Sequence, residues 1–260
     1  MVIVRIISHK NRVVRQVVFM VLFFVSLLPC HAQTDIGTTG LMNVPTADMR
    51  PAGTFDGGAS FIQKDLLFEK YSSKKSAVSS YNTFLFWVSF TPFPWIELAF
   101  RETLLKTQKS KTDTRIGYYQ QDRSWSIRVQ PLKEGKYWPA VVVGTNDLFY
   151  SKSTSDSRSA YACVYGVVSK HVPLQNVGTF EGTLAYAHPI KDGITYDGVM
   201  GGLSFAPAFF PDMRVMGEYD TRGYNVGVGA FLFKHLNVTC FTREFKGVSA
   251  TLSYQYTIKY

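Results

Sequence analysis

From residue 54 to its end, the chain consists of segments of about ten residues whose side chains alternate between apolar and polar. Side-chain direction reverses at every strand residue, so each segment has one apolar face and one polar face. The apolar face of the last segment, GVSATLSYQYTIKY (247–260), carries Val248, Leu252, Tyr254 and Ile258. Its polar face carries Ser249, Thr251, Ser253 and Gln255. Helical periodicity is absent, so the alternation restricts the chain to an all-β fold.

The pattern predicts twelve strands. They lie near residues 54–63, 80–91, 95–105, 124–131, 138–148, 159–170, 178–188, 197–207, 212–220, 223–233, 235–243 and 247–259. An even count places both ends on one side, as single-chain bacterial outer-membrane barrels require. Tight turns such as TPFPW (91–95) alternate with longer connections rich in Lys and Ser over the first eight strands. Short turns on one side and long loops on the other are typical of such barrels.

Charged residues recur on the polar faces, where Glu97 and Arg101 oppose Leu98 and Phe100, for example. A soluble sandwich could bury the apolar faces and leave the charges in water, whereas a membrane barrel turns the apolar faces to lipid. The export signal, the aromatic-rich apolar faces and the terminal Tyr260 favour the barrel. The predicted fold is therefore an antiparallel up-and-down transmembrane β-barrel of about 12 strands.

The N-terminus is typical of a targeting segment, with four basic residues, an apolar run from Val17 to Pro29 and small residues before Gln33. We expect residues 1–32 to be a cleaved signal peptide, 33–53 an entry or plug segment, and 54–260 the outer-membrane barrel. An uncleaved anchor and lipidation at Cys30, in the sequence LLPC, are the alternatives. Without the four basic residues the formal charge of +9 falls to +5. This mild excess and the export route argue against a nucleic-acid partner.

Seven charged residues are the candidates for the lumen and for ligand contact. They are Glu97, Arg101, Arg128, Glu181, Arg214, Glu218 and Arg243. Projecting from different strands into one lumen, they can pair with each other or offer hydrogen bonds to a passing sugar chain. Basic residues in the outer loops can attract anionic glycan or lipopolysaccharide, or can simply be solvated. These are Lys70, Lys74, Lys75, Lys106, Lys109 and Lys111.

The sequence contains no metal cluster, phosphate loop or nucleophile motif, so we expect no cofactor, no metal and no enzymatic activity. His171, His188 and His235 stand at predicted turns or strand ends. His188 near Asp192 suggests an acid/base pair, but a pair without a third group is a weak candidate for hydrolysis. The remaining cysteines, Cys163 and Cys240, fall on strands that are not neighbours, so we expect free thiols.

Aromatic residues near predicted strand ends are expected in interface girdles. They are Trp87, Trp95, Trp125, Tyr137 and Trp138. Trp87 shares its parity with Leu85 and Ser89, so a lumen-facing position is the alternative for this residue.

Two stretches, GTTGLMNVPTADMRPAGTF (37–55) and DRSWSIRVQPLKEGKYWPAVVVGTND (122–147), resemble the YjbH-like family, as do the later VVSKHV and GEYD. That family comprises exported outer-membrane β-barrels tied to exopolysaccharide or capsule production. Well-known members are longer and often lipid-anchored, and the usual Gly-Thr after Asp147 is replaced here by Leu148, Phe149 and Tyr150. Glycines and prolines in the first stretch exclude a central strand and are compatible with a plug or a linker.

The resemblance implies a role in assembly or export of exopolysaccharide or capsule across the outer membrane. The implied partners are outer-membrane lipid and lipopolysaccharide, a polysaccharide chain and periplasmic export proteins. A small diffusion porin, a structural or adhesive surface barrel and a membrane-embedded hydrolase remain as alternatives. If the lumen has room, Arg at Thr251 or Ser253 is tolerated, whereas Arg at Leu252 is costly in a bilayer.

Overall fold

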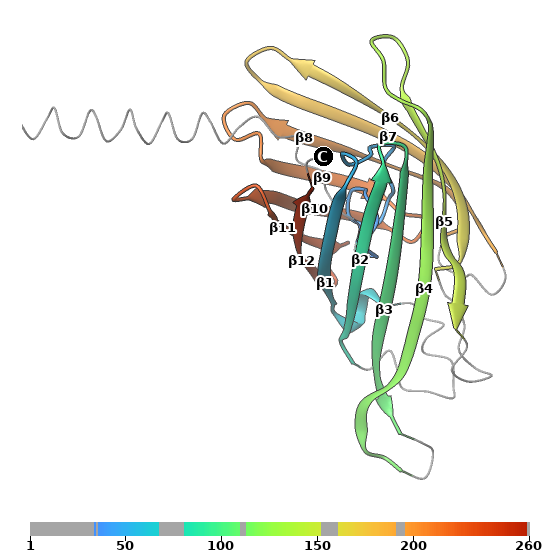
Figure 1. Ribbon diagram of the computed structural model, residues 1–260. Helices are drawn as coiled ribbons and strands as arrows, with labels where there is room; N and C mark the ends of the chain where they lie inside the picture. Colours follow the sequence, from blue (N-terminus) through green and yellow to red (C-terminus); the bar gives the residue numbers. More distant parts are fainter. Residues whose placement is uncertain are drawn as a thin grey trace, which may run out of the picture.

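The computed structural model describes residues 34, 36–67, 81–109, 113–151, 161–190 and 196–258. Within this part of the chain, twelve antiparallel strands close into one ring (Figure 1). The strands are β1 Thr54–Ile62, β2 Thr83–Phe93, β3 Ile96–Gln108, β4 Ile116–Leu132, β5 Ala140–Ser151, β6 Cys163–Leu174, β7 Gly178–Pro189, β8 Gly198–Pro207, β9 Met213–Tyr219, β10 Tyr224–Leu232, β11 Leu236–Arg243 and β12 Val248–Thr257. A short 3-10 turn, η1 Lys64–Leu66, follows β1. The expected signal peptide lies outside the described residues.

Each strand pairs with the next along the chain, and β1 closes the ring by pairing with β12, with Thr54 opposite Thr257. The up-and-down barrel of twelve strands is thus confirmed. We call the end of the barrel where β1 begins and β12 ends the terminal mouth. Short turns, such as 94–95, 175–177 and 233–235, lie at this end. The opposite end, which carries the longer connections, is the loop mouth.

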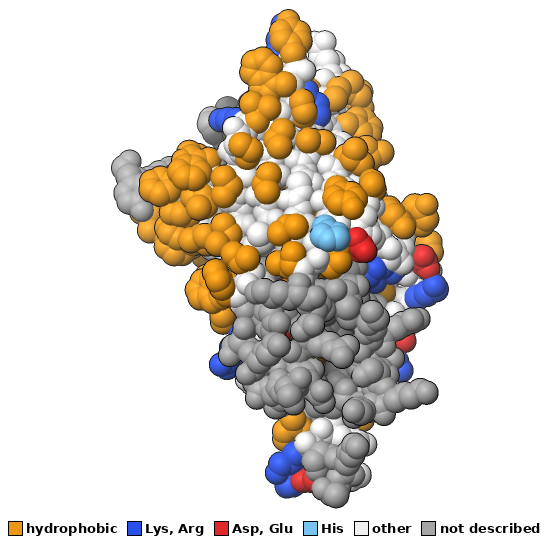
Figure 2. All heavy atoms as spheres, turned by 90° about the vertical axis from the view of Figure 1, so that its right-hand side faces the viewer, with side chains coloured by type: hydrophobic (Ala, Val, Ile, Leu, Met, Phe, Trp, Pro, Cys, Tyr) orange, Lys and Arg blue, Asp and Glu red, His pale blue; other side chains and the backbone are white. Residues whose placement is uncertain are grey.

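The side chains alternate between the two faces of the wall as the pattern predicts. On β12, Leu252 is 53% exposed and Tyr254 55%, whereas Thr251 is 4% exposed and its hydroxyl lies 2.9 Å from that of Ser60 inside the ring. Apolar side chains are spread over the described wall in Figure 2. An apolar surface that surrounds a barrel and continues over many strands is typical of contact with lipid.

The largest difference from the predicted strand boundaries is at β4, which begins at Ile116 rather than near residue 124, whereas β6 lies four residues later than expected at both ends. The polar stretch that looked like a loop continues the ladder, with Gly117 opposite Thr107 of β3. Backbone hydrogen bonds to an existing strand extend the pairing beyond the region where the apolar pattern is clear. The two strands therefore extend toward the loop mouth in Figure 1.

The tryptophans divide between the two faces. Trp95, Trp125 and Trp138 are about half exposed on the outside of the ring, as girdle residues would be. Trp87 is 2% exposed and faces inward, so its assignment to the outer girdle is wrong and the alternative from its parity with Leu85 is right. Cys163 on β6 and Cys240 on β11 are free. No described helix is long and apolar enough to cross a bilayer.

Candidate functional site: the lumen and its N-terminal segment

Residues 34–53, which we call the inner segment, precede β1 and lie inside the ring. Residues 36–47 are buried. Their backbone hydrogen-bonds to Glu97 of β3 and to Glu218 of β9, strands on opposite sides of the ring. A segment that reaches both sides must cross the interior, and the blue coil lies among the strands in Figure 1. The inner segment therefore forms part of the hydrophobic core, because its apolar side chains pack against inward-facing residues of the wall.

Glu218 holds the turn at the centre of the inner segment. The turn is closed by a hydrogen bond from the Leu41 amide to the Val44 carbonyl at 2.9 Å. The Glu218 carboxylate accepts the backbone N–H groups of Met42, Asn43 and Val44 at 3.0, 2.8 and 3.1 Å. Successive N–H groups that converge in this way form an anion-binding concavity, here filled by a side chain of the same protein.

Glu97 and Arg128 hold the two flanks of that turn. The Glu97 carboxylate accepts the Thr39 amide at 3.0 Å and the Thr39 hydroxyl at 2.7 Å. It also pairs with Arg128 at 2.9 Å, and both side chains are fully buried. Arg128 donates in turn to the carbonyls of Thr46 and Asp48. This pair therefore satisfies one backbone donor before the turn and two backbone acceptors after it.

Glycines on the wall provide the space that the inner segment occupies. A Cβ at Gly202 of β8 would lie 2.5 Å from Leu41 Cδ1, and one at Gly227 of β10 would lie 2.6 Å from Met42 Sδ. Within the segment, Gly37 has a φ of +93°, and a Cβ there would lie 2.5 Å from the Trp87 ring. The wall and the segment are thus matched in shape as well as in hydrogen bonding.

Two further clusters lie nearer the loop mouth. Arg101 pairs with Asp147 at 2.8 Å and lies over the ring of Tyr161, 4.3 Å from its centroid. In the loop after β9, Asp220 pairs with Arg243 at 2.6 Å. Burial opposes ionisation of Asp220, but two neighbouring arginines outweigh it and lower its pKa below the ordinary value.

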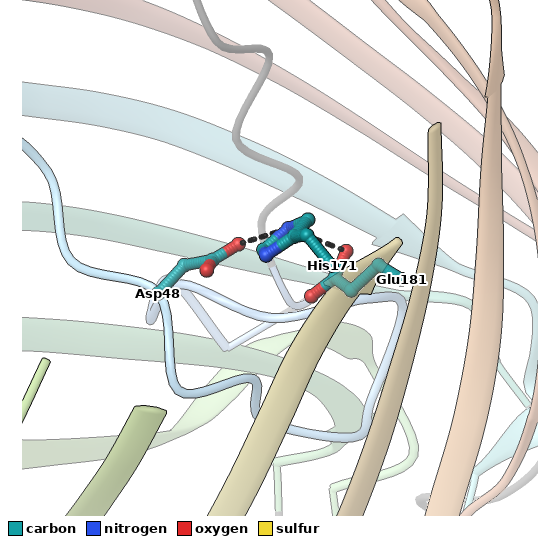
Figure 3. A group of neighbouring side chains, drawn as sticks. All are labelled: Asp48, His171 and Glu181. Atoms are coloured by element: carbon teal, nitrogen blue, oxygen red, sulfur yellow. Dashed lines mark ion pairs between the residues drawn. The ribbon is translucent and has the colours of Figure 1, made fainter. Parts of the chain in front are cut away.

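A third cluster lies at the terminal mouth, where the inner segment leaves the lumen. His171 of β6 lies between Asp48 of the inner segment and Glu181 of β7, and the three side chains point toward one another in Figure 3. Glu181 also pairs with Arg214 of β9 at 3.2 Å. Glu134, in the connection between β4 and β5, binds the His171 ring at 2.7 Å. Burial tends to raise the pKa of Glu134, but the hydrogen bonds with His171 outweigh burial and hold this pKa below its ordinary value.

All seven charged residues proposed from the sequence point into the ring, six of them buried and Arg243 half-buried. The structure brings Glu97 together with Arg128, and Glu181 with Arg214. Asp48 and His171 were missed as parts of a site. Neither the alternation nor the spacing of these residues indicates that they meet.

The other candidates lie elsewhere. His188 is exposed on the outer side of β7, where its ring is 3.7 Å from the exposed Asp197, and Asp192 lies outside the described residues. The His235 ring lies 2.9 Å from the Gln255 carbonyl. Of the loop lysines, Lys70, Lys74, Lys75 and Lys111 lie outside the described residues, whereas Lys106 and Lys109 lie at the loop mouth.

A family model described as "Exopolysaccharide biosynthesis protein YbjH" matches residues 32–188. The chain belongs to the YjbH family. The match covers the inner segment and strands β1 to β7. The contacts of the inner segment with β3, β4 and β6 therefore all lie within the matched residues. No curated protein matches the chain by sequence.

Solved structures similar to this YjbH protein include two outer-membrane phospholipases. The Salmonella typhi enzyme, solved as a dimer with bound calcium, has 9% identity and a TM-score of 0.38 over 80% of this chain and 92% of that one. The Escherichia coli enzyme has 8% identity and a TM-score of 0.37 over 81% of this chain and 98% of that one.

Proposed function

We propose that this protein is an outer-membrane β-barrel that acts in the assembly or export of exopolysaccharide, and that its inner segment closes the lumen. Membership of an exopolysaccharide biosynthesis family supports the process. The closed ring with apolar side chains on its outer face supports the membrane location. On this view the terminal mouth faces the periplasm and the longer loops face outward. Lipopolysaccharide and periplasmic export proteins are the partners that this placement implies.

The observation that carries the proposal is the hydrogen bonding of the inner segment across the lumen. Glu218 on one side and the pair Glu97 and Arg128 on the other bind its backbone rather than water. A constitutive diffusion pore has no use for such a crossing. A gated exporter does, because the segment must be held until its cargo or partner displaces it.

The same side chains suit a sugar chain once the segment has moved. Carboxylates and guanidinium groups form strong, charge-assisted hydrogen bonds with hydroxyl groups. Displacement of the inner segment would remove the N–H donors that Glu97 and Glu218 accept and the carbonyl acceptors that Arg128 uses, which is costly unless new partners replace them. Sugar hydroxyls can replace both the N–H donors and the carbonyl acceptors, so binding of the chain would offset the loss of the segment.

A disulfide between Ala47 of the inner segment and Ser169 of β6 tests this proposal. The Ala47 amide donates to the Ser169 hydroxyl at 2.8 Å. That contact limits the Cα separation to about 6.7 Å, within the range that a disulfide spans. Cells that produce the Ala47→Cys, Ser169→Cys protein should lose surface exopolysaccharide when the bond forms, and a reductant should restore it.

The single variants Ala47→Cys and Ser169→Cys are the controls, and mass spectrometry measures how much of the double variant is bonded. Both single variants should export normally with or without reductant. Normal surface exopolysaccharide from the fully bonded double variant would contradict the proposal, because the cargo would then not need the inner segment to move.

A further inference from the structure

Three metal-ligating side chains converge at the terminal mouth, and they come from two different parts of the fold. The His171 Nε2 atom is 3.7 Å from Asp48 Oδ2 and 3.9 Å from Glu181 Oε2. One ligand atom from each residue lies within 4.8 Å of the others. Asp48 belongs to the inner segment, whereas His171 and Glu181 belong to adjacent strands, β6 and β7 (Figure 3).

The imidazole of His171 is oriented for ligation by a fourth residue. Glu134 lies 2.7 Å from His171 Nδ1 and also accepts the His171 backbone N–H at 3.0 Å. A carboxylate on one ring nitrogen holds the proton there and leaves the lone pair on the other nitrogen, which here faces Asp48 and Glu181. Carboxylate–histidine pairs of this kind support ligating histidines in metal sites.

The third ligand has a free oxygen atom, and there is space beside it. Glu181 is 2% exposed, and its Oε1 atom is buried without a hydrogen-bond partner within the described residues, while Oε2 serves Arg214 and Ser204. Oε2 is the oxygen that lies 3.9 Å from His171 Nε2, and Oε1 leaves the carboxylate with acceptor capacity that Arg214 and Ser204 do not use. A cavity of about 530 Å³, lined in part by all three ligands, has room for the water molecules that would complete a coordination shell.

We propose that Asp48, His171 and Glu181 form a binding site for a divalent transition-metal ion, with Zn²⁺ the best match, and that the ion fastens the inner segment to the wall. Zn²⁺ binds both imidazole nitrogen and carboxylate oxygen, and three protein ligands with a water in the fourth position is its usual open arrangement. Bonds of about 2.0–2.1 Å place tetrahedral ligands about 3.3 Å apart, so the two measured gaps must close by about half an ångström. Rotation of the Asp48 and His171 side chains, which are half-buried, can supply that movement.

The alternative is a simple ion-pair cluster in which a protonated His171 neutralises the carboxylates without any metal. The two readings differ in what binds to the purified protein. The existence of the site does not depend on the proposed function, whereas its role as a fastening does rest on it.

Binding of Zn²⁺ to the mature full-length barrel in detergent micelles, without a polyhistidine tag, tests the proposal. Titration against a chromophoric chelator should show one tight site. His171→Gln should weaken binding about 100-fold or more, and Glu134→Gln about 10- to 100-fold, as loss of an outer carboxylate does in other sites. His188→Gln, which changes an exposed histidine outside the cluster, is the matched control and should bind as the parent does.

Asp48→Asn isolates the contribution of the inner segment, since this variant leaves both wall ligands in place. It should bind Zn²⁺ more weakly, and Zn²⁺ should slow hydrogen exchange of the inner segment in the parent but not in Asp48→Asn. Unchanged affinity in folded His171→Gln would overturn the site. Unchanged affinity in Asp48→Asn would overturn the fastening. Tight binding together with normal export from the disulfide-locked variant would refute the proposed function and leave the metal site standing.

Discussion

Glu218 is the residue whose replacement should loosen the inner segment most directly. Its carboxylate accepts three backbone N–H groups of the turn at residues 42–44 and, in addition, the side-chain amide of Asn225 at 3.0 Å. Oε2 accepts two of the three N–H groups and Oε1 accepts the third. Glu218→Gln preserves the shape of the side chain but replaces one acceptor oxygen with a donor NH₂ group.

The size of the effect follows from that geometry. In the better orientation of the new side-chain amide, its oxygen retains the two N–H groups and its NH₂ group faces the third, so one charge-assisted hydrogen bond to the segment is lost outright and the two that remain become neutral. Hydrogen bonds to charged groups contribute about 1.5–3 kcal/mol. At 1.4 kcal/mol per factor of ten, the amides of residues 42–44 should exchange about 10- to 150-fold faster.

Hydrogen–deuterium exchange followed by mass spectrometry, on the barrel in detergent, measures that change. Glu102→Gln is the matched control, because Glu102 pairs at 3.0 Å with Arg123 and both side chains are partly exposed on the wall. It should leave exchange of the inner segment unchanged. Equal exchange rates in Glu218→Gln and the parent would refute the conclusion that the Glu218 carboxylate holds the turn.

Three further outcomes are expected. Leu252→Arg should cost about 2–4 kcal/mol of unfolding free energy in lipid vesicles, with Leu252→Ala much milder, because this side chain faces outward near the middle of β12; equal costs would place that face away from lipid. Gly37→Ala should lower the melting temperature and speed exchange of the inner segment, because the new Cβ would meet the Trp87 ring; an unchanged melting temperature would show that the fit is loose. The folded-state pKa of Asp220 is lowered, so its contribution to stability is present above the unfolded pKa of about 3.9 and is lost as pH falls through the folded-state pKa. Melting temperatures measured from pH 6 to 2 should therefore fall less in Asp220→Asn than in the parent.

The alternation of side chains was sufficient to predict the strands and their two faces, because a period of two is local to each strand and does not depend on distant contacts. The choice of a closed ring over a sandwich needed the export signal, the aromatic-rich apolar faces and the terminal Tyr260 as well. The polar face of β12 shows where this information ends. Thr251 and Ser253 were expected to tolerate Arg if the lumen had room, but both are buried. Ser253 packs so closely against Gly58 that a Cβ added to that glycine would lie only 2.6 Å from the Ser253 Cβ. Local pattern indicates that a face points inward and does not indicate what fills the interior.

The inner segment and the cluster at the terminal mouth show the same limit. Glu97 and Glu218 could be placed in the lumen from their parity, but their partners lie 58 and about 175 positions away in the chain. Asp48 and His171 have no spacing that connects them, because the contact arises only when the inner segment turns back through the ring. Long-range contacts of this kind depend on the three-dimensional path of the chain, so sequence alone left both plug and linker open.

The central claim is that the inner segment closes the lumen, and conductance across a planar lipid bilayer tests it most directly. The purified mature protein should insert without opening stable channels. The double variant Glu97→Gln, Glu218→Gln, in which the segment is released on both sides of the ring, should conduct. A parent protein that conducts constitutively, with no increase in the double variant, would show that the segment does not close the lumen and would favour a simple diffusion pore.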